Sequence, residues 1–123
     1  MDKRSENGNI TLTAGGAIAK GEFVKFSSGK VVKCTAATDA AIGVALDAAA
    51  ADGDIVPVAV LGSFTGTVQI KAAGAIAQGA EVTPQGKEQT SAGTTELICG
   101  RALEAAAAAG DMIEIAHAVC HAK

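Results

Sequence analysis

Two similar stretches decide the expected fold: ALDAAAADGDIVPVAV at Ala45–Val60 and ALEAAAAAGDMIEIAHA at Ala102–Ala118. Alanine is the best helix former, but each alanine run spans only about one turn, too short to nucleate a helix alone. Each run ends in Gly-Asp, directly before a segment rich in the strand formers Val and Ile. We therefore expect each stretch to form strand, tight connection and strand, with short turns or single helical turns at the alanines.

The chain also repeats itself over a longer distance. The sequence GGAIAKG at Gly15–Gly21 resembles AGAIAQG at Ala73–Gly79, and the segments that begin at Gly43 and Gly100 resemble one another. Two copies are too few for a solenoid, which needs three or more. We expect an all-β fold, a small barrel or sandwich built from two internal repeats of about 57 residues. The repeats are residues 10–62 and 67–119, within one β domain of residues 10–123.

Short segments rich in Val, Ile and Thr favour β-strands along the whole body of the chain. They occupy residues 10–13, 22–26, 30–34, 42–46, 54–64, 67–72, 80–84, 96–103 and 112–120. In the last segment, Ile113, Ile115 and Val119 are expected to share the inward face with His117. Pro57 and Pro84 indicate edge strands or bulges, because proline cannot donate a hydrogen bond to a neighbouring strand.

The composition argues against several classes of function. Of the 123 residues, 49% are hydrophobic but only 2% are aromatic, namely Phe23, Phe26 and Phe64. Ligand pockets and single-strand nucleic-acid sites usually use aromatic side chains. The net charge of −3 leaves no basic surface for phosphates. No apolar run approaches the ~20 residues of a membrane span, and the N-terminus lacks the apolar segment of a signal peptide. We expect neither a nucleic acid nor a membrane as partner.

One glycine pair has the spacing of a phosphate-binding loop. Gly16 and Gly21 are separated by four residues, but Glu22 and Phe23 follow where that loop needs Lys and then Ser or Thr. Without those side chains the loop has no phosphate contact and no Mg²⁺ ligand, so the pattern excludes an ATPase. The glycines are better explained as turn residues.

The cysteines and histidines suggest no catalytic or metal site. Three cysteines, Cys34, Cys99 and Cys120, do not form the paired spacing of a disulfide framework, and we interpret them as small core residues of a protein made in a reducing compartment. His117, Cys120 and His121 lie close in sequence, but strand neighbours point to opposite faces and cannot converge on a metal. We expect no enzyme activity, no metal and no cofactor. A small enzyme that uses Cys99 or Cys120 with His117 remains an alternative.

A family resemblance rests on three segments: IGVALDAAAADGDIVPVAVLGSF, VQIKAAGAIAQGAEV and GRALEAAAAAGDMIEI. In this order they resemble the small decoration, or cement, proteins of tailed-bacteriophage capsids, sometimes labelled recombinase-like, over about residues 10–116. The resemblance implies a β-rich structural virion protein, made in the host cytoplasm, that binds the outer surface of the capsid. It also implies that the protein clamps neighbouring major capsid subunits and acts as a homo-oligomer, a dimer or trimer. The alternative is a non-catalytic host- or carbohydrate-binding module, which the scarcity of aromatic residues argues against.

The first nine residues differ in character from the rest of the chain. Residues 1–9 are polar, their charges cancel, and Gly8 and Asn9 favour turns. We expect a flexible N-terminal arm that becomes ordered on a partner. The residues expected to contact the capsid are Asp2, Lys3, Arg4, Ser5, Glu6 and Asn7.

Overall fold

The computed structural model describes residues 9–63, 66–89 and 96–122. These ranges are all-β, with no helix, so the expected fold class is confirmed. The strands are β1 (Asn9–Thr13), β2 (Phe23–Ser27), β3 (Lys30–Lys33), β4 (Gly43–Ala45), β5 (Ile55–Val60), β6 (Val68–Lys71), β7 (Glu81–Val82), β8 (Leu97–Ala102) and β9 (Met112–Ala122). Each lies within or largely overlaps an expected segment. The single helical turn allowed at the alanines does not form, whereas the short turns do.

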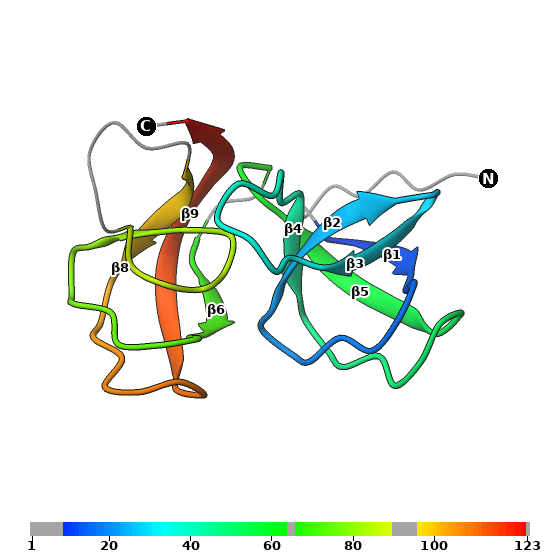
Figure 1. Cartoon of the computed structure of the whole chain (residues 1–123), viewed down its shortest axis with the longest axis horizontal. Helices are drawn as coiled ribbons and strands as arrows, with labels where there is room; N and C mark the ends of the chain where they lie inside the picture. The colour runs from blue at the N-terminus through cyan, green and yellow to red at the C-terminus, as the bar shows by residue number, and fades with distance from the viewer. Residues whose placement is uncertain (1–8, 64–65, 90–95, 123) are drawn as a thin grey trace.

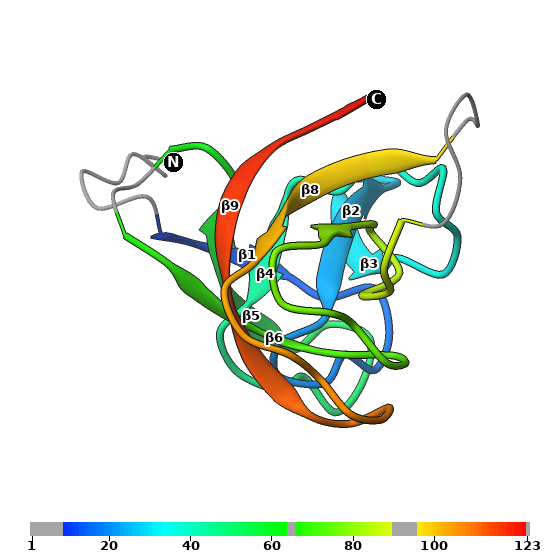
Figure 2. The same ribbon diagram turned by 90° about the vertical axis from the view of Figure 1, so that its left-hand side faces the viewer.

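The strands form two antiparallel sheets, seen as two lobes side by side in Figure 1. The first sheet has the order β1-β5-β4-β2-β3, and the second has the order β6-β9-β8-β7. The first lobe therefore comes from the N-terminal half of the chain and the second from the C-terminal half. Figure 2 shows the second lobe in front, with β8 and β9 running beside one another. The second sheet, β6-β9-β8-β7, has the same arrangement as β1-β5-β4-β2, which are the first four neighbouring strands of the first sheet.

The alanine runs pair with the Gly-Ala-Ile-Ala segments rather than forming helices. Ile18 and Ala49 exchange backbone hydrogen bonds of 2.9 and 2.8 Å, and Ile76 and Ala106 exchange bonds of 3.0 and 2.9 Å. All four side chains are buried. A larger residue than alanine would not fit easily at a close-packed bridge of this kind, so the second alanine of each run is part of the core.

The Gly-Asp pairs close these connections in the same way in both lobes. Asp54 Oδ2 accepts hydrogen bonds from two preceding backbone N–H groups at 2.9 and 3.1 Å, and Asp111 Oδ2 does the same at 2.9 and 3.1 Å. Gly53 and Gly110 both have a φ of +95°, which side chains disfavour. Such matched bonds are what a repeat predicts, and the repetition of the entire units 10–62 and 67–119 stays a prediction.

The two lobes share one hydrophobic core. Phe23, Val44 and Leu61 of the first lobe lie in the same buried cluster as Ile70 and Ile115 of the second. A second cluster lies entirely within the first lobe, around Leu12, Ala14, Ile18, Val24, Val31, Val56 and Val58. The lobes are also joined by backbone hydrogen bonds from Lys71 N to Gly21 O at 2.9 Å and from Leu97 N to Ala37 O at 2.8 Å. They are therefore packed as one body.

Two expectations about individual positions are wrong. Val119 is 63% exposed, because the pairing of β8 with β9 shifts between Ile98 and Gly100 and interrupts the alternation of faces. Pro57 does not lie on an edge, since β5 is flanked by β1 and β4. Its missing N–H faces Leu46, the first residue beyond β4, whose own N–H donates to Pro57 O at 2.9 Å. The proline is tolerated because that ladder ends there.

Candidate functional site

The expected contact residues of the arm, Asp2, Lys3, Arg4, Ser5, Glu6 and Asn7, lie outside the described residues. The described surface offers a second candidate, the two alanine-rich connections. We call residues 47–54 the first tip and residues 104–111 the second tip. Both lie at the same end of the molecule, the lower end in Figures 1 and 2. The chain thus presents two similar elements at one end, one below each lobe.

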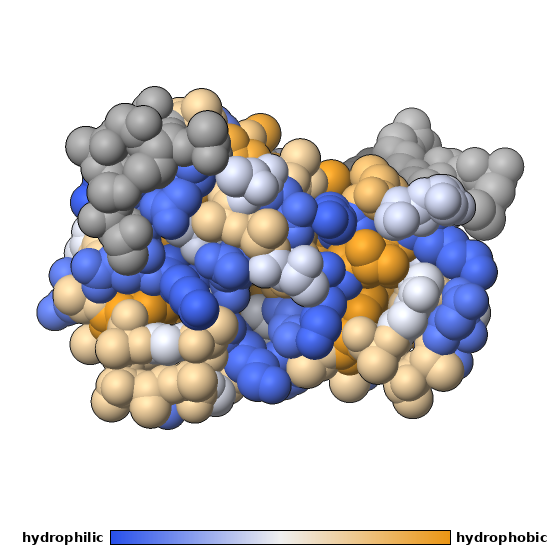
Figure 3. Space-filling model, in the orientation of Figure 1, coloured by the Kyte–Doolittle hydropathy of each residue, from blue (hydrophilic) through white to orange (hydrophobic). Residues whose placement is uncertain are grey.

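The tips expose small apolar side chains edged by carboxylates. The exposed alanines are Ala48, Ala50 and Ala51 on the first tip, and Ala105, Ala107, Ala108 and Ala109 on the second. Two exposed aliphatic residues adjoin them, Ile55 at 68% and Leu103 at 43%. Tan, moderately apolar residues accordingly run along the lower edge of both lobes in Figure 3. Acidic residues flank the alanines at positions 47, 52, 54, 104 and 111, and Lys30 Nζ lies 2.8 Å from the Asp52 carboxylate.

This combination suits docking rather than catalysis. Alanine has no rotamer freedom to lose on contact, so a surface of alanines is ordered at little entropic cost. The backbone of each tip is already fixed by its aspartate and by the bridge to Ile18 or Ile76. From the sequence, the alanines were expected to form only a connection. A sequence does not show which side chains are exposed, or that two distant runs lie at the same end of the molecule.

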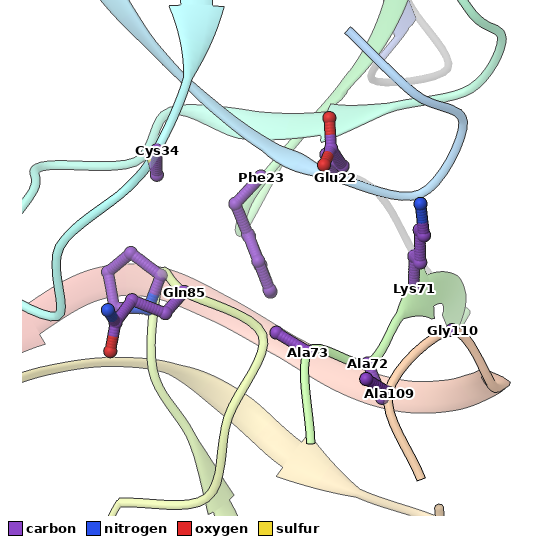
Figure 4. Close-up of a pocket in the computed structure, with 10 residues that line it drawn as sticks. Glu22, Phe23, Cys34, Lys71, Ala72, Ala73, Gln85, Ala109 and Gly110 are labelled. Atoms are coloured by element: carbon purple, nitrogen blue, oxygen red, sulfur yellow. The ribbon is translucent and has the colours of Figure 1, made fainter.

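A cavity of about 270 Å³ lies at the junction of the lobes (Figure 4). Glu22, Phe23 and Cys34 line it from the first lobe, and Lys71 and Gln85 line it from the second. Glu22 Oε1 accepts a hydrogen bond from Ala19 N at 2.8 Å, and Gln85 Nε2 donates to Thr35 O at 3.0 Å, so both polar groups serve the local structure. Burial, and secondarily Asp39, raises the pKa of the Cys34 thiol to about 12, which keeps it protonated and poorly nucleophilic.

The two histidines suggested by the sequence lie in different surroundings. His117 Nδ1 accepts a hydrogen bond from Gly62 N at 2.9 Å. His121 lines a different hollow of about 230 Å³ with Glu81 and Arg101. Among the residues that the structure describes, no three His, Cys, Asp or Glu side chains are placed to hold a metal ion. In the same part of the chain, no helix is suited to crossing a membrane.

One ion pair organises the loop between β3 and β4, which contacts the second lobe. Lys25 Nζ lies 2.9 Å from Asp39 Oδ1, and Asp39 Oδ2 accepts hydrogen bonds from Thr35 N at 2.8 Å and Ala36 N at 3.0 Å. The hydrogen bond from Lys25 is the main cause that lowers the pKa of Asp39. Because the backbone of this loop also bonds to Leu97, the charge pair has a structural role at the junction.

Comparison with known proteins identifies the family. No curated protein matches the chain. Among solved structures, the head fiber gp8.5 N base of bacteriophage phi29 shares the fold, with a TM-score of 0.66 and 17% sequence identity, over 94% of this chain and 97% of that one. The sequence itself matches the profile of the family described as phage cement protein over residues 3–117. The chain therefore belongs to the phage cement protein family, which makes it a capsid-associated structural protein of a phage virion.

Proposed function

We propose that the chain binds the outer surface of a phage capsid and stabilises the shell by clamping neighbouring major capsid subunits. The family match over residues 3–117 is the observation that carries this proposal. The phi29 head fiber base supports it through the shared fold alone. The protein is made in the host cytoplasm and acts on the finished shell without a catalytic step.

The rigid junction of the lobes supports a clamping role. A clamp holds two neighbouring subunits only if its own contact elements keep a fixed separation. The shared core and the backbone bonds from Lys71 to Gly21 and from Leu97 to Ala37 tie the two lobes together. The two tips are therefore held at one spacing, and each of them can make a modest contact because many copies act together on a shell.

We further propose that the N-terminal arm adds to this docking through Asp2, Lys3, Arg4, Ser5, Glu6 and Asn7. Its side chains are polar and carry both signs of charge, which suits rim contacts that set orientation more than affinity. Deletion of residues 2–8 leaves β1, which begins at Asn9, intact. If shells bind this variant to the same occupancy as the full chain, the role of the arm is refuted.

Co-sedimentation with purified shells tests the main proposal. The full chain should sediment with expanded shells of its phage, and a variant with Ala51→Arg and Ala108→Arg should show at least a tenfold lower affinity. Ala40→Arg, an equally exposed alanine on the loop after Cys34, is the matched control and should bind normally. Failure of the unaltered chain to bind shells would overturn the proposed function, whereas normal binding of the tip variant would overturn only the role of the tips.

The oligomeric state is a separate part of the proposal. We propose a dimer or trimer, because a capsid offers its binding sites around symmetry axes. Light scattering of the purified protein should give a mass two or three times the 12.0 kDa of the chain. If the protein has the mass of a monomer both when it is free and when it comes from dissociated shells, the proposed oligomer is contradicted.

A further inference from the structure

The three cysteines are far apart in the sequence but gather in the core of the folded chain. Cys99 on β8 is fully buried, and Cys34 and Cys120 are half-buried against the same cluster of apolar residues. The Cys120 thiol also lies 3.7 Å from Asp39 O in the loop that follows Cys34. The junction of the lobes thus contains three thiols that neither docking nor clamping uses.

The register of β8 with β9 brings two of these cysteines together. Leu97 pairs with Ala122 and Ile98 pairs with His121, and one further step of that register would set Cys99 opposite Cys120, at the point where the register shifts. The pairing resumes, shifted, at Gly100 with His117, which leaves Ala118 and Val119 as extra residues of β9. Directly opposed residues of antiparallel strands have Cβ atoms about 4.5–5.5 Å apart, and a disulfide needs about 3.5–4.5 Å, so the bond requires the two strands to move slightly closer at this irregularity.

The side chains of the pair point to the same side of the sheet. Cys99 and Cys120 both contact the core cluster, whereas their neighbours Ile98 and His121 line the hollow on the other side. Besides burial, a side-chain hydrogen bond from Cys120 is among the causes that raise the pKa of Cys99. Cys34 follows the end of β3 in the first lobe, so it belongs to a different sheet from this pair.

We propose that Cys99 and Cys120 are a site of reversible oxidation and form a disulfide that ties the C-terminal end of β9 to β8. The oxidant is a low-molecular-weight disulfide. The Cys120 thiol, which is the more accessible, gives its proton to solvent and attacks one sulfur of the oxidant, releasing one small thiol. Cys99 then loses its proton and attacks the Cys120 sulfur, which releases the second small thiol. Two protein thiols are oxidised and one small disulfide is reduced to two thiols.

Burial makes this reaction slow while the protein is in neutral, reducing surroundings. Burial is the main cause that raises the pKa of Cys99, and the neighbouring Cys120 and Cys34 raise it further. Because the thiolate is the attacking form, the rate should increase with pH. The bond itself does not depend on the proposed function. The expected time of its formation does depend on the proposed function, because on a phage particle the disulfide would form after release into oxidising surroundings.

Mass spectrometry of the folded full chain tests the proposal. The protein is incubated with oxidised glutathione at about pH 9, where thiolate is more abundant, and the free thiols are then alkylated. We expect the three free thiols to fall to one, a mass loss of two hydrogens, and a cross-linked peptide that joins Cys99 to Cys120. Cys34→Ala should form the same cross-link, so that its two free thiols fall to none, and Cys120→Ala should yield no internal disulfide.

Three outcomes would overturn the proposal. The first is a cross-link that contains Cys34. The second is a stable glutathione adduct on Cys120 that does not react further. The third is a folded protein that keeps three free thiols under conditions in which the unfolded chain oxidises readily. Thermal unfolding provides a second measurement, because a disulfide restricts the unfolded chain. Oxidised protein and oxidised Cys34→Ala should both unfold several degrees above their reduced forms, and an unchanged midpoint would also count against the bond.

Discussion

Gly21 and Gly79 offer a matched test of how tightly the two lobes are joined. They have nearly equal φ angles, +88° and +87°, and their N–H groups donate equivalent hydrogen bonds of 2.8 Å, to Ala45 O and Ala102 O. They differ in what lies beside them. Gly21 contacts the other lobe, whereas a Cβ at Gly79 would have nothing within 4 Å. The same substitution to alanine therefore separates backbone strain from the fit between the lobes.

The expected magnitudes follow from this geometry. A left-handed backbone costs an alanine roughly 1–2 kcal/mol, and this applies to both variants. At Gly21 the added Cβ would lie 2.7 Å from Lys71 N, short of the 3.4 Å at which ordinary contact begins. Lys71 N cannot withdraw without breaking its own bond to Gly21 O. Overpacking of this kind costs about 1–3 kcal/mol, so Gly21→Ala should lose about 2–5 kcal/mol in all.

Urea denaturation followed by circular dichroism measures both variants. The free energy of unfolding comes from linear extrapolation, and an unchanged slope shows that the same surface is exposed on unfolding. We expect Gly21→Ala to be less stable than Gly79→Ala by about 1–3 kcal/mol. Equal losses for the two variants would refute the reasoning, because they would show that the junction yields to the added methyl group at no cost.

Three further predictions concern the core, a tip and the junction loop. Ile70→Ala should reduce the free energy of unfolding by about 2–5 kcal/mol, whereas Ile55→Ala, at an exposed position, should change it by less than about 0.5 kcal/mol. Similar losses of stability for the two variants in urea titrations would contradict the assigned burial. Asp111→Ala should cost about 0.5–2 kcal/mol by analogy with helix caps, because two backbone N–H groups lose their acceptor, and a thermal midpoint equal to that of the unaltered chain would count against this. Lys25 lowers the pKa of Asp39, so the stability that this carboxylate contributes is full above its unfolded pKa of about 3.9 and is lost as the pH falls through the lower folded value. The unaltered chain should therefore lose more stability than Asp39→Asn on acidification from about pH 5, and parallel pH profiles would disprove the effect.

The strands were predictable because their evidence is local. In β6, Val68 and Ile70 are buried and Gln69 and Lys71 are exposed, which is the alternation that a strand over residues 67–72 requires. Period-two alternation, β-branched residues and Gly-rich breaks act over a few residues, so the sequence can be read directly. The family resemblance depended on the same local segments, and the profile match confirmed it.

The errors occurred where distant segments decide the outcome. Pro57 was expected in an edge strand or at a bulge, but β5 is central because β1, from the start of the described chain, pairs with the side of β5 that β4 leaves open. Val119 was expected to be buried, but the shifted register with β8 leaves it as an extra, exposed residue. A one-dimensional pattern contains no information about such a shift in the partner strand.

The sequence by itself determined that this is a β protein of short strands, poor in aromatic residues and without a recognisable catalytic motif, because composition and alternation are properties of neighbouring residues. Only the tertiary structure decided that the alanine runs are bridges held by Ile18 and Ile76, that the two tips lie at one end, and that Cys99 and Cys120 pack in the same core cluster. Each of these depends on contacts between residues distant in the chain, which form only when the burial of the shared core offsets the entropy of closing the intervening loops.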